Sequence, residues 1–230
     1  MPRQIIFPPV EEADTDGLLA VGGDLELDTL LTAYSQGIFP WPISLDFPLA
    51  WFSPDPRGVL DVETFHIPTS FKKWLKKTRF KVTFSTCFET VILRCAQAER
   101  KNQPGTWITS DIIQGYKKLF EAGHAYSVEV WDDSNELVGG LYGVCFGGYL
   151  SGESMFSSKT GASKLALLKL VELIKENDLK WFDTQMVTPV VELFGGFYLP
   201  REEFITRLEA VDWNQKREDI FKYKTVLNVD

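Results

Sequence analysis

The sequence predicts an α+β protein with a mostly antiparallel sheet. Strand patterns at 125–131, 137–146 and 147–156 are separated only by short turn signals, Asp132-Asp-Ser-Asn135 and Gly147-Gly148. Strands joined by such short turns run in opposite directions. Helical patterns precede these strands, and a long helix and one further strand follow them. An antiparallel meander with helices before and after it is typical of the α+β class.

Length and composition limit the class of protein. The 230 residues are enough for one large domain or two small ones. No apolar run reaches the ~18 residues that a membrane helix needs, and the N-terminus shows no signal-peptide pattern. We therefore expect a cytoplasmic protein with no membrane partner. The three cysteines and two histidines lack metal-ligand spacing, so we expect no metal site and no disulfide framework.

The N-terminal segment is expected to form a small α/β domain. Leucines 27, 30 and 31 and Tyr34 have helical spacing, and Gly37 would end that helix. Two stretches rich in proline and aromatic residues follow, at 38–42 and 48–57. Dense prolines argue against regular structure, so we place the junction between residues 54 and 60. The predicted domains are 1–57 and 58–230.

The second domain is expected to hold the rest of the secondary structure. Apolar periodicity predicts helices at 68–77, 86–98, 110–122 and 200–208, and a long helix from residue 162. Strands are predicted at 80–85 and 181–184. Thr86 and Glu89 have the spacing of a capping box at the start of the second helix. A loop at 103–106 is expected to lead into Trp107.

Charge is unevenly distributed along the chain. The formal net charge is −8, which argues against non-specific nucleic-acid binding. Six basic residues nevertheless lie between positions 72 and 81, with apolar residues interspersed. This run is either a solvated helix face or a local phosphate-binding patch.

Two carboxylates and an amide form the first candidate site. Glu153 lies within the 147–156 strand, and Asp183 and Gln185 lie at the end of the 181–184 strand. If these strands are neighbours, the three side chains converge and can hold an ammonium group. The alternative is structural, with Asp183 capping a turn and Glu153 pairing with a surface lysine.

Three aromatic residues form a second candidate site. Trp107 and Tyr116 lie on a loop and on the helix after it, and Trp41 lies in the first aromatic stretch. Together they can stack a nucleotide base, or they can simply belong to the core. The single glycine in Ser158-Lys-Thr-Gly161 makes a poor anion-binding loop before the long helix.

Nine short motifs in order carry a family resemblance. Three lie near the N-terminus: Gly17-Leu-Leu-Ala-Val-Gly-Gly-Asp-Leu25, Tyr34-Ser-Gln-Gly-Ile-Phe-Pro-Trp41 and Trp51-Phe-Ser-Pro-Asp-Pro-Arg57. Six follow: Gly105-Thr-Trp-Ile108, Ser127-Val-Glu-Val-Trp131, Val138-Gly-Gly-Leu-Tyr-Gly143, Ser151-Gly-Glu-Ser-Met-Phe-Ser157, Ala162-Ser-Lys164 and Asp183-Thr-Gln185. In this order the chain resembles the leucyl/phenylalanyl-tRNA–protein transferases, from about residue 17 to residue 208.

The resemblance implies a fold, an activity and partners. The fold is a small N-terminal domain on a C-terminal acetyltransferase-like (GNAT-type) domain. The activity is transfer of Leu or Phe, with Met as a third candidate, from aminoacyl-tRNA to the N-terminal Arg or Lys of a protein, which marks that protein for N-end-rule degradation. The basic run at 72–81 is expected to serve the tRNA acceptor stem. No metal or other cofactor is implied.

The resemblance also implies roles for individual residues. The positions that hold the 3′-terminal adenosine of the tRNA correspond to Trp41, Trp107 and Tyr116. The pocket for the transferred side chain corresponds to Leu141, Leu170 and Ile174, of which the last two positions are often aromatic in the family. The reaction centre corresponds to Asp183 and Gln185, and the residue near the acceptor peptide to Glu153. We expect Asp183 to orient Gln185, and Gln185 to hold the attacking amine.

Two other readings of the sequence remain open at this point. A CoA-dependent N-acetyltransferase would need a glycine-rich loop before the long helix, where only Gly161 fits. A non-catalytic RNA-binding module would use the aromatic and basic residues, but it would leave Glu153, Asp183 and Gln185 without a role.

Overall fold

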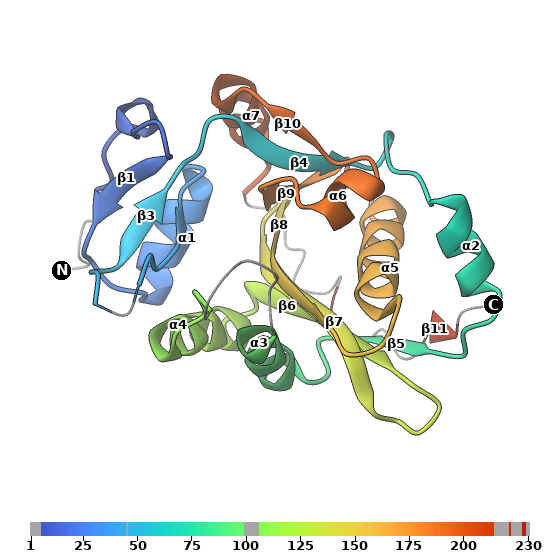
Figure 1. The fold of residues 1–230 in the computed structure, drawn as a ribbon. Helices are drawn as coiled ribbons and strands as arrows, with labels where there is room; N and C mark the ends of the chain where they lie inside the picture. Colours follow the sequence, from blue (N-terminus) through green and yellow to red (C-terminus); the bar gives the residue numbers. More distant parts are fainter. Residues whose placement is uncertain (1–5, 45, 99–105, 214–220, 222–226, 229–230) are drawn as a thin grey trace.

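The computed structural model describes residues 6–44, 46–98, 106–213, 221 and 227–228. Its strands form two sheets, one of three strands in the order β1-β3-β2 and one of eight in the order β10-β4-β9-β8-β7-β6-β5-β11 (Figure 1). Among the described strand pairs only β8 with β9 is parallel. The prediction of an α+β protein with a mostly antiparallel sheet is therefore confirmed.

The small sheet packs with helix α1 in the N-terminal part of the chain. Its strands are β1 (Leu18–Val21), β2 (Phe39–Pro40) and β3 (Ala50–Phe52), and α1 spans Leu27–Ser35; a short 3-10 helix, η1 (Val10–Glu12), precedes them. The expectation that the proline-rich stretches lack regular structure is wrong. The three residues of β3 are not prolines, so their N–H groups remain available for pairing on both sides.

The large sheet begins immediately after the proline-rich segment. β4 (Arg57–Asp61) pairs with β9 (Trp181–Gln185) on one side and with β10 (Phe197–Leu199) on the other. The sequence did not predict β4, β10 or the short helix α6 (Pro189–Leu193). One buried cluster contains Tyr34 and Trp51 together with Tyr149 and Phe204. The division into 1–57 and 58–230 stays a prediction, because this cluster includes residues from both sides of it.

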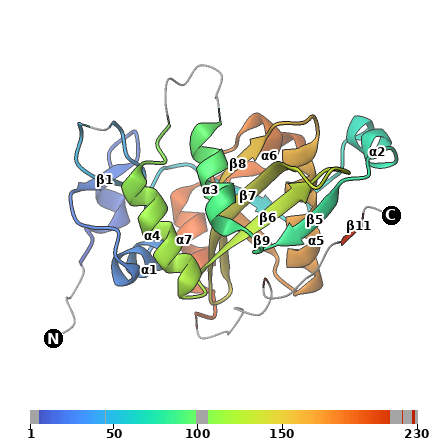
Figure 2. The same ribbon diagram turned by 90° about the horizontal axis from the view of Figure 1, so that it is seen from below.

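The predicted meander is present and carries helices on both faces. Its strands are β6 (Ala125–Trp131), β7 (Leu137–Phe146) and β8 (Tyr149–Ser157). Helix α5 (Ala162–Glu176) covers one face, and α3 (Phe88–Gln97) and α4 (Ser110–Glu121) cover the other (Figure 2). The remaining elements are α2 (Thr69–Leu75), β5 (Lys81–Phe84), α7 (Arg201–Glu209) and β11 (Leu227–Asn228). None of the helices in the described ranges has the length and apolar character of a membrane span.

The start of α3 differs from the predicted capping box. The residue that precedes the helix is Cys87, and no side-chain cap bond is made. Thr86 instead donates its hydroxyl to Glu129 Oε2 at 2.8 Å. The backbone N–H groups of Thr86 and Cys87 also point to this carboxylate, at 3.4 and 3.5 Å. A buried Glu129 on β6 therefore satisfies the helix N-terminus, and Glu89 pairs with Lys117 on the surface.

We expect the Glu129→Ala variant to lose about 2–4 kcal/mol of unfolding free energy. The hydroxyls of Thr83, Thr86 and Ser127 all donate to this carboxylate. Removing it leaves the buried Ser127 hydroxyl and the half-buried Thr83 hydroxyl without this acceptor. The matched control, Glu89→Ala at the predicted capping position, should change stability by less than about 0.5 kcal/mol. Urea unfolding measures both variants. Equal losses would show that Glu129 contributes no more to the start of the helix than Glu89 does.

Candidate active site

The parallel pairing of β8 with β9 builds the centre of the site. Ser151 on β8 is in register with Asp183 on β9, so Glu153 and Gln185, two residues further along each strand, face each other. The Gln185 side-chain amide Nε2 lies 3.0 Å from both carboxylate oxygens of Glu153. The convergence of Glu153, Asp183 and Gln185 that neighbouring strands would produce is therefore present.

Glu153 is a buried carboxylate held by neutral donors. Its side chain is 9% exposed. It accepts hydrogen bonds from the Ser151 hydroxyl at 2.6 Å and the Tyr116 hydroxyl at 3.0 Å, besides those from the Gln185 amide. Burial raises the pKa of Glu153, although these hydrogen bonds oppose the shift. Every partner in these hydrogen bonds is uncharged, so none of them balances the negative charge of Glu153.

Asp183 has the opposite environment. Arg57 Nε donates to Asp183 Oδ1 at 2.9 Å, and Arg57 Nη2 donates to Oδ2 at 2.6 Å. The Gln185 backbone N–H donates to Oδ1, and the Tyr149 hydroxyl donates to Oδ2. Asp183 and Arg57 are 0% and 1% exposed. Each oxygen of Asp183 thus accepts two hydrogen bonds within the protein, and the carboxylate does not reach the surface of the site.

Gln185 has a left-handed backbone, with φ of 60°. This conformation costs a non-glycine residue about 1–2 kcal/mol and must be held by its surroundings. The hydrogen bond from the Gln185 backbone N–H to Asp183 Oδ1 stabilises this conformation. Strand β4 also stabilises it. The pairing of β4 with β9 is irregular at Gly58, opposite Gln185, and a Cβ atom at Gly58 would come within 2.6 Å of the Met186 carbonyl carbon.

Tyr116 lies behind Glu153 rather than beside a binding surface. Its side chain is fully buried, and its hydroxyl bonds the hydroxyl of Tyr34 as well as Glu153. Burial, and then the charge of Glu153, raise the pKa of Tyr116. The hydroxyl therefore stays protonated and acts as a donor. In this structure the ring presents no face on which a base could stack.

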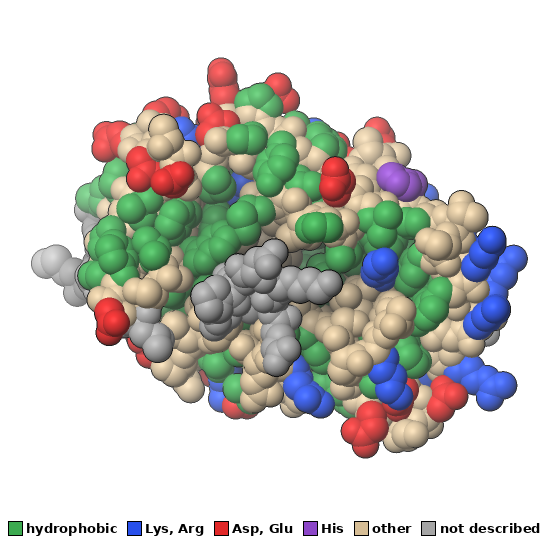
Figure 3. All heavy atoms as spheres, in the orientation of Figure 1, with side chains coloured by type: hydrophobic (Ala, Val, Ile, Leu, Met, Phe, Trp, Pro, Cys, Tyr) green, Lys and Arg blue, Asp and Glu red, His purple; other side chains and the backbone are tan. Residues whose placement is uncertain are grey.

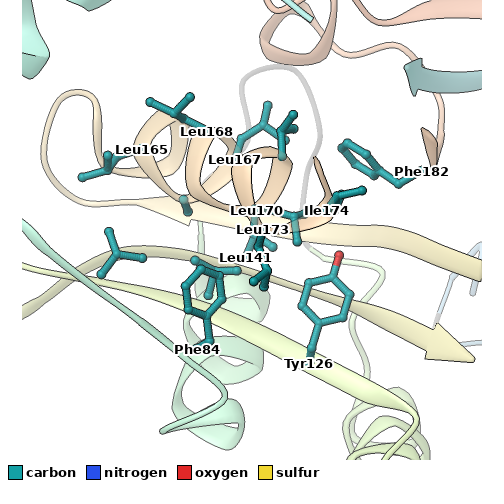
Figure 4. Packing of buried hydrophobic residues seen from close by; sticks show 14 of the residues in the cluster. Phe84, Tyr126, Leu141, Leu165, Leu167, Leu168, Leu170, Leu173, Ile174 and Phe182 are labelled. Atoms are coloured by element: carbon teal, nitrogen blue, oxygen red, sulfur yellow. The ribbon is translucent and has the colours of Figure 1, made fainter. Parts of the chain in front are cut away.

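An apolar pocket opens beside Glu153. Its volume is about 260 Å³. The predicted Leu141 and Leu170 line it, but the predicted Ile174 does not. Ile174 is fully buried in the main core, and Figure 4 shows it among other α5 side chains that face the sheet. The other apolar walls come from Met155, Leu167, Phe182 and Val191.

Trp41 and Trp107 both line this pocket. Their ring centroids lie 6.1 Å apart with an interplanar angle of 46°, and neither ring is fully buried. The structure therefore brings together two of the three aromatic residues that the sequence analysis grouped. Residues 99–105, which include most of the loop expected before Trp107, lie outside the described residues.

The basic run lies on and after α2. Lys72, Lys73, Lys76 and Lys77 are exposed, whereas Trp74 between them is half-buried. In Figure 3 lysine and arginine side chains gather at the edge of the molecule where Figure 1 draws α2. Trp74 also covers the start of α5: a Cβ atom on Gly161 would lie 2.5 Å from its ring. The weak anion loop expected before α5 is thus covered by an aromatic side chain.

Three buried neighbours of the reaction centre were not predicted from the sequence: Arg57, Tyr149 and Ser151. Arg57 ends one of the motifs, and Tyr149 and Ser151 precede Glu153 on its strand. A signal was available for Ser151, because side chains at i and i+2 lie on the same face of a strand. No local pattern pairs Arg57 with a residue 126 positions away.

Comparison with known proteins identifies the family. The family model for "Leucyl/phenylalanyl-tRNA protein transferase" matches residues 59–209, and the model for the N-terminal domain of that family matches residues 23–55. The chain belongs to the leucyl/phenylalanyl-tRNA protein transferase family. It is an enzyme that transfers an aminoacyl group from tRNA to protein N-termini.

Relatives of this name align along most of the chain. The chain is 48% identical over 212 residues to the leucyl/phenylalanyl-tRNA–protein transferase of Pseudoalteromonas atlantica, covering 91% of this chain and 89% of the relative. It is 44% identical over 208 residues to the enzyme of Anaeromyxobacter dehalogenans, covering 90% and 88%. Among solved structures, L-PGS from Bacillus licheniformis aligns with a TM-score of 0.40 and 16% identity, over 69% of this chain and 50% of that one.

We expect the buried Glu153 to make stability depend on pH in a defined direction. In the unfolded chain its pKa is about 4.3, and burial raises the pKa in the folded protein. The folded state therefore binds this proton more tightly. The unfolding free energy of the wild type, relative to Glu153→Gln, should fall as pH rises from about 4.3 through the raised pKa, and should then level off.

Urea unfolding of both proteins between about pH 4 and pH 8 measures this difference. Glu202→Gln, on the exposed first turn of α7, controls for the general loss of a carboxylate. A wild-type advantage that grows with rising pH would contradict the buried, uncompensated charge at Glu153.

Proposed function

We propose that this enzyme transfers Leu or Phe, with Met as a third donor, from aminoacyl-tRNA to the N-terminal Arg or Lys of acceptor proteins. The observation that carries the proposal is Glu153, a buried carboxylate on the wall of an apolar pocket whose hydrogen-bond donors are all neutral. A charge of this kind is costly to bury alone. A cationic acceptor N-terminus supplies the missing positive charge.

The apolar pocket takes the side chain of the transferred amino acid. Its walls include Leu141, Leu167, Leu170 and Phe182. Aliphatic and aromatic walls accept Leu, Phe and Met, because these side chains bring no unpaired charge into the pocket. A transferred Asp would be rejected for the same reason, because its carboxylate would enter beside Glu153 with no cation to pair with. Ile174, which does not line the pocket, acts only through the packing of α5.

The 3′-terminal adenosine of the tRNA stacks at Trp41 and Trp107. These rings lie at the same pocket as Glu153, and stacking on aromatic rings holds a base without requiring a particular sequence. Tyr116 contributes indirectly in this account, because its hydroxyl orients the Glu153 carboxylate. The exposed lysines of α2 contact phosphates of the acceptor stem.

The reaction requires positioning more than strong acid–base catalysis. The donor is an activated ester, and the acceptor α-amine has a pKa of about 7.7–8.0, so a modest fraction is already deprotonated. The amine attacks the ester carbonyl, an amide forms, and the ester bond to the ribose breaks. The amine loses one proton, and the departing ribose oxygen gains one. Holding the amine and the carbonyl in contact supplies most of the rate.

Each residue of the centre has a defined part in this step. Gln185 binds Glu153 through Nε2, so its carbonyl Oε1 is the atom that accepts an N–H from the amine. Glu153 attracts the cationic acceptor. Asp183 does not take the proton, since both of its oxygens already accept hydrogen bonds inside the protein. It orients Gln185 instead, through the Gln185 backbone N–H.

Two further expectations belong to this proposal. An acetyltransferase-like (GNAT-type) C-terminal domain is supported by the antiparallel β6–β8 meander, followed by α5 and the parallel strand β9. A cytoplasmic location is supported by the donor, because aminoacyl-tRNA is used where proteins are made. The CoA-dependent alternative is disfavoured by family membership and by Trp74, which covers the start of α5.

The direct test is transfer of labelled Leu or Phe from charged tRNA to peptides that begin with Arg, Lys or Ala. We expect transfer to the Arg and Lys peptides and little to the Ala peptide. Gln185→Ala should lower kcat by about 100-fold or more, with tRNA affinity retained. Gln114→Ala, an exposed glutamine on α4, is the matched control. Equal turnover of Gln185→Ala and Gln114→Ala would refute the role of Gln185.

The second test concerns the basic run. The double variant Lys72→Gln, Lys76→Gln should flatten the salt dependence of tRNA binding, because phosphate contacts release counterions. Each lost contact should reduce the slope of log Kobs against log salt by about 1. The double variant Lys175→Gln, Lys180→Gln removes the same charge from exposed positions elsewhere. Identical slopes for the two double variants would show that α2 presents only a solvated face.

A further inference from the structure

Arg57 joins four separate segments around the reaction centre. It lies at the start of β4, and it binds Asp183 on β9 with two hydrogen bonds. Its Nη1 donates to the carbonyl of Gly37, at the end of α1, at 2.9 Å. Its guanidinium carbon lies 4.7 Å from the ring centroid of Phe39 and 4.5 Å from that of Phe204 on α7. All three donor nitrogens in these bonds therefore point inside the protein.

The positive charge of Arg57 forms its ion pair with Asp183. Burial works against the ionised guanidinium, but the attraction of Asp183 outweighs burial, and the pKa of Arg57 is raised. Arg57 therefore stays cationic beside the Asp183 carboxylate. The net charge of the site is therefore left on Glu153, which makes no ion pair with Arg57 in this structure.

The Asp183 carboxylate, which Arg57 holds in place, in turn binds the backbone of Gln185. Its Oδ1, the oxygen that accepts Arg57 Nε, also accepts the Gln185 backbone N–H at 2.8 Å. That bond fixes the peptide at which the backbone turns left-handed. Gly58, the neighbour of Arg57, lies so close to Met186 that a Cβ atom would be 2.6, 2.8 and 2.9 Å from three of its backbone atoms. Arg57 thus holds the left-handed turn at Gln185 through Asp183. Gly58 has no side chain, which leaves space for the backbone of that turn.

We propose that Arg57 and Gly58 are positioning residues for aminoacyl transfer. Together they hold the left-handed turn at Gln185, which directs the Gln185 amide onto Glu153 and presents its carbonyl to the acceptor amine. Neither residue contacts substrate, so both act through β9. The proposal deepens the function proposed above and rests on it.

The position of Arg57 separates this role from substrate binding. Arg57 does not line the pocket that holds Leu141, Trp41 and Trp107. A change at Arg57 that keeps the protein folded should therefore alter the chemical step and leave the affinity for aminoacyl-tRNA unchanged. A purely structural residue would instead lower the amount of folded enzyme, without changing kcat per folded molecule.

The test compares Arg57→Lys with Arg207→Lys. Arg207 offers a matched pair: it binds both oxygens of Asp61 and lies near the rings of Trp181 and Phe197, but it does not touch Asp183. In each variant lysine keeps the positive charge but cannot form the bidentate hydrogen bonds to the carboxylate. We expect Arg57→Lys to lower kcat at least about 10-fold, since small misplacements of reacting groups are costly. KM for aminoacyl-tRNA should stay within about twofold, and Arg207→Lys should resemble the wild type.

Gly58→Ala is the second variant, should Arg57→Lys fold poorly. Its methyl group pushes against the Met186 backbone, so it should lower kcat in the same way and leave the KM for aminoacyl-tRNA unchanged. The kcat of each variant is calculated per folded molecule. The amount of folded protein is measured by a method that does not depend on the active site, such as circular dichroism. If Arg57→Lys and Gly58→Ala match Arg207→Lys in kcat, or if they raise KM in proportion, the positioning role is overturned. Failure of the wild type to transfer at all would refute the proposed function instead.

Discussion

The site depends on the buried ion pair between Arg57 and Asp183. A buried pair of this kind recovers its desolvation cost only when the remaining donors and acceptors are also satisfied. Here the Gly37 carbonyl, the Tyr149 hydroxyl and the Gln185 backbone N–H complete the set. The pair links β4 with β9 and reaches the end of α1, so the N-terminal segment takes part in shaping the reaction centre. Breaking one partner would leave the other as an uncompensated buried charge.

The two carboxylates of the site differ because of their partners. Asp183 is bound through both oxygens by the Arg57 guanidinium and does not line the pocket. Glu153 accepts hydrogen bonds only from neutral donors and lies on the pocket wall. In the proposed function, this difference leaves the negative charge of Glu153 available for a cationic acceptor N-terminus. The strained Gln185 backbone, fixed from the side of Asp183, places the amide between these two environments.

The sequence predicted the parts of this arrangement that follow from local pattern. Strand patterns separated by short turns gave the β6–β8 meander. The convergence of Glu153, Asp183 and Gln185 was predicted only on the condition that their two strands are neighbours, which the pairing of β8 with β9 fulfils. Periodicity gave the apolar face of α5, but it could not tell Leu170 at the pocket from Ile174 in the core, because both lie on that face. Tyr116 was expected at a binding surface, yet helical spacing does not reveal how deeply a ring is buried.

Tertiary interactions account for what the sequence did not predict. Arg57 follows a proline-rich segment and meets its partner 126 positions later, so no motif spacing connects the two. The cap of α3 has the same origin, since Glu129 comes from another strand and replaces the local capping box at Thr86 and Glu89. In both cases a buried carboxylate is satisfied by residues that only the folded sheet brings together.

The most direct measurement is a crystal structure of the enzyme with a non-hydrolysable 3′-leucylamido-adenosine and a peptide that begins with Arg. We expect the leucine side chain in the pocket beside Leu141 and Leu170, and the adenine ring at Trp41 and Trp107. We also expect the peptide α-nitrogen within hydrogen-bonding distance of Gln185 Oε1, with the cationic N-terminus next to Glu153. An α-nitrogen bound directly to Asp183, or an acceptor peptide located away from Glu153, would contradict this arrangement.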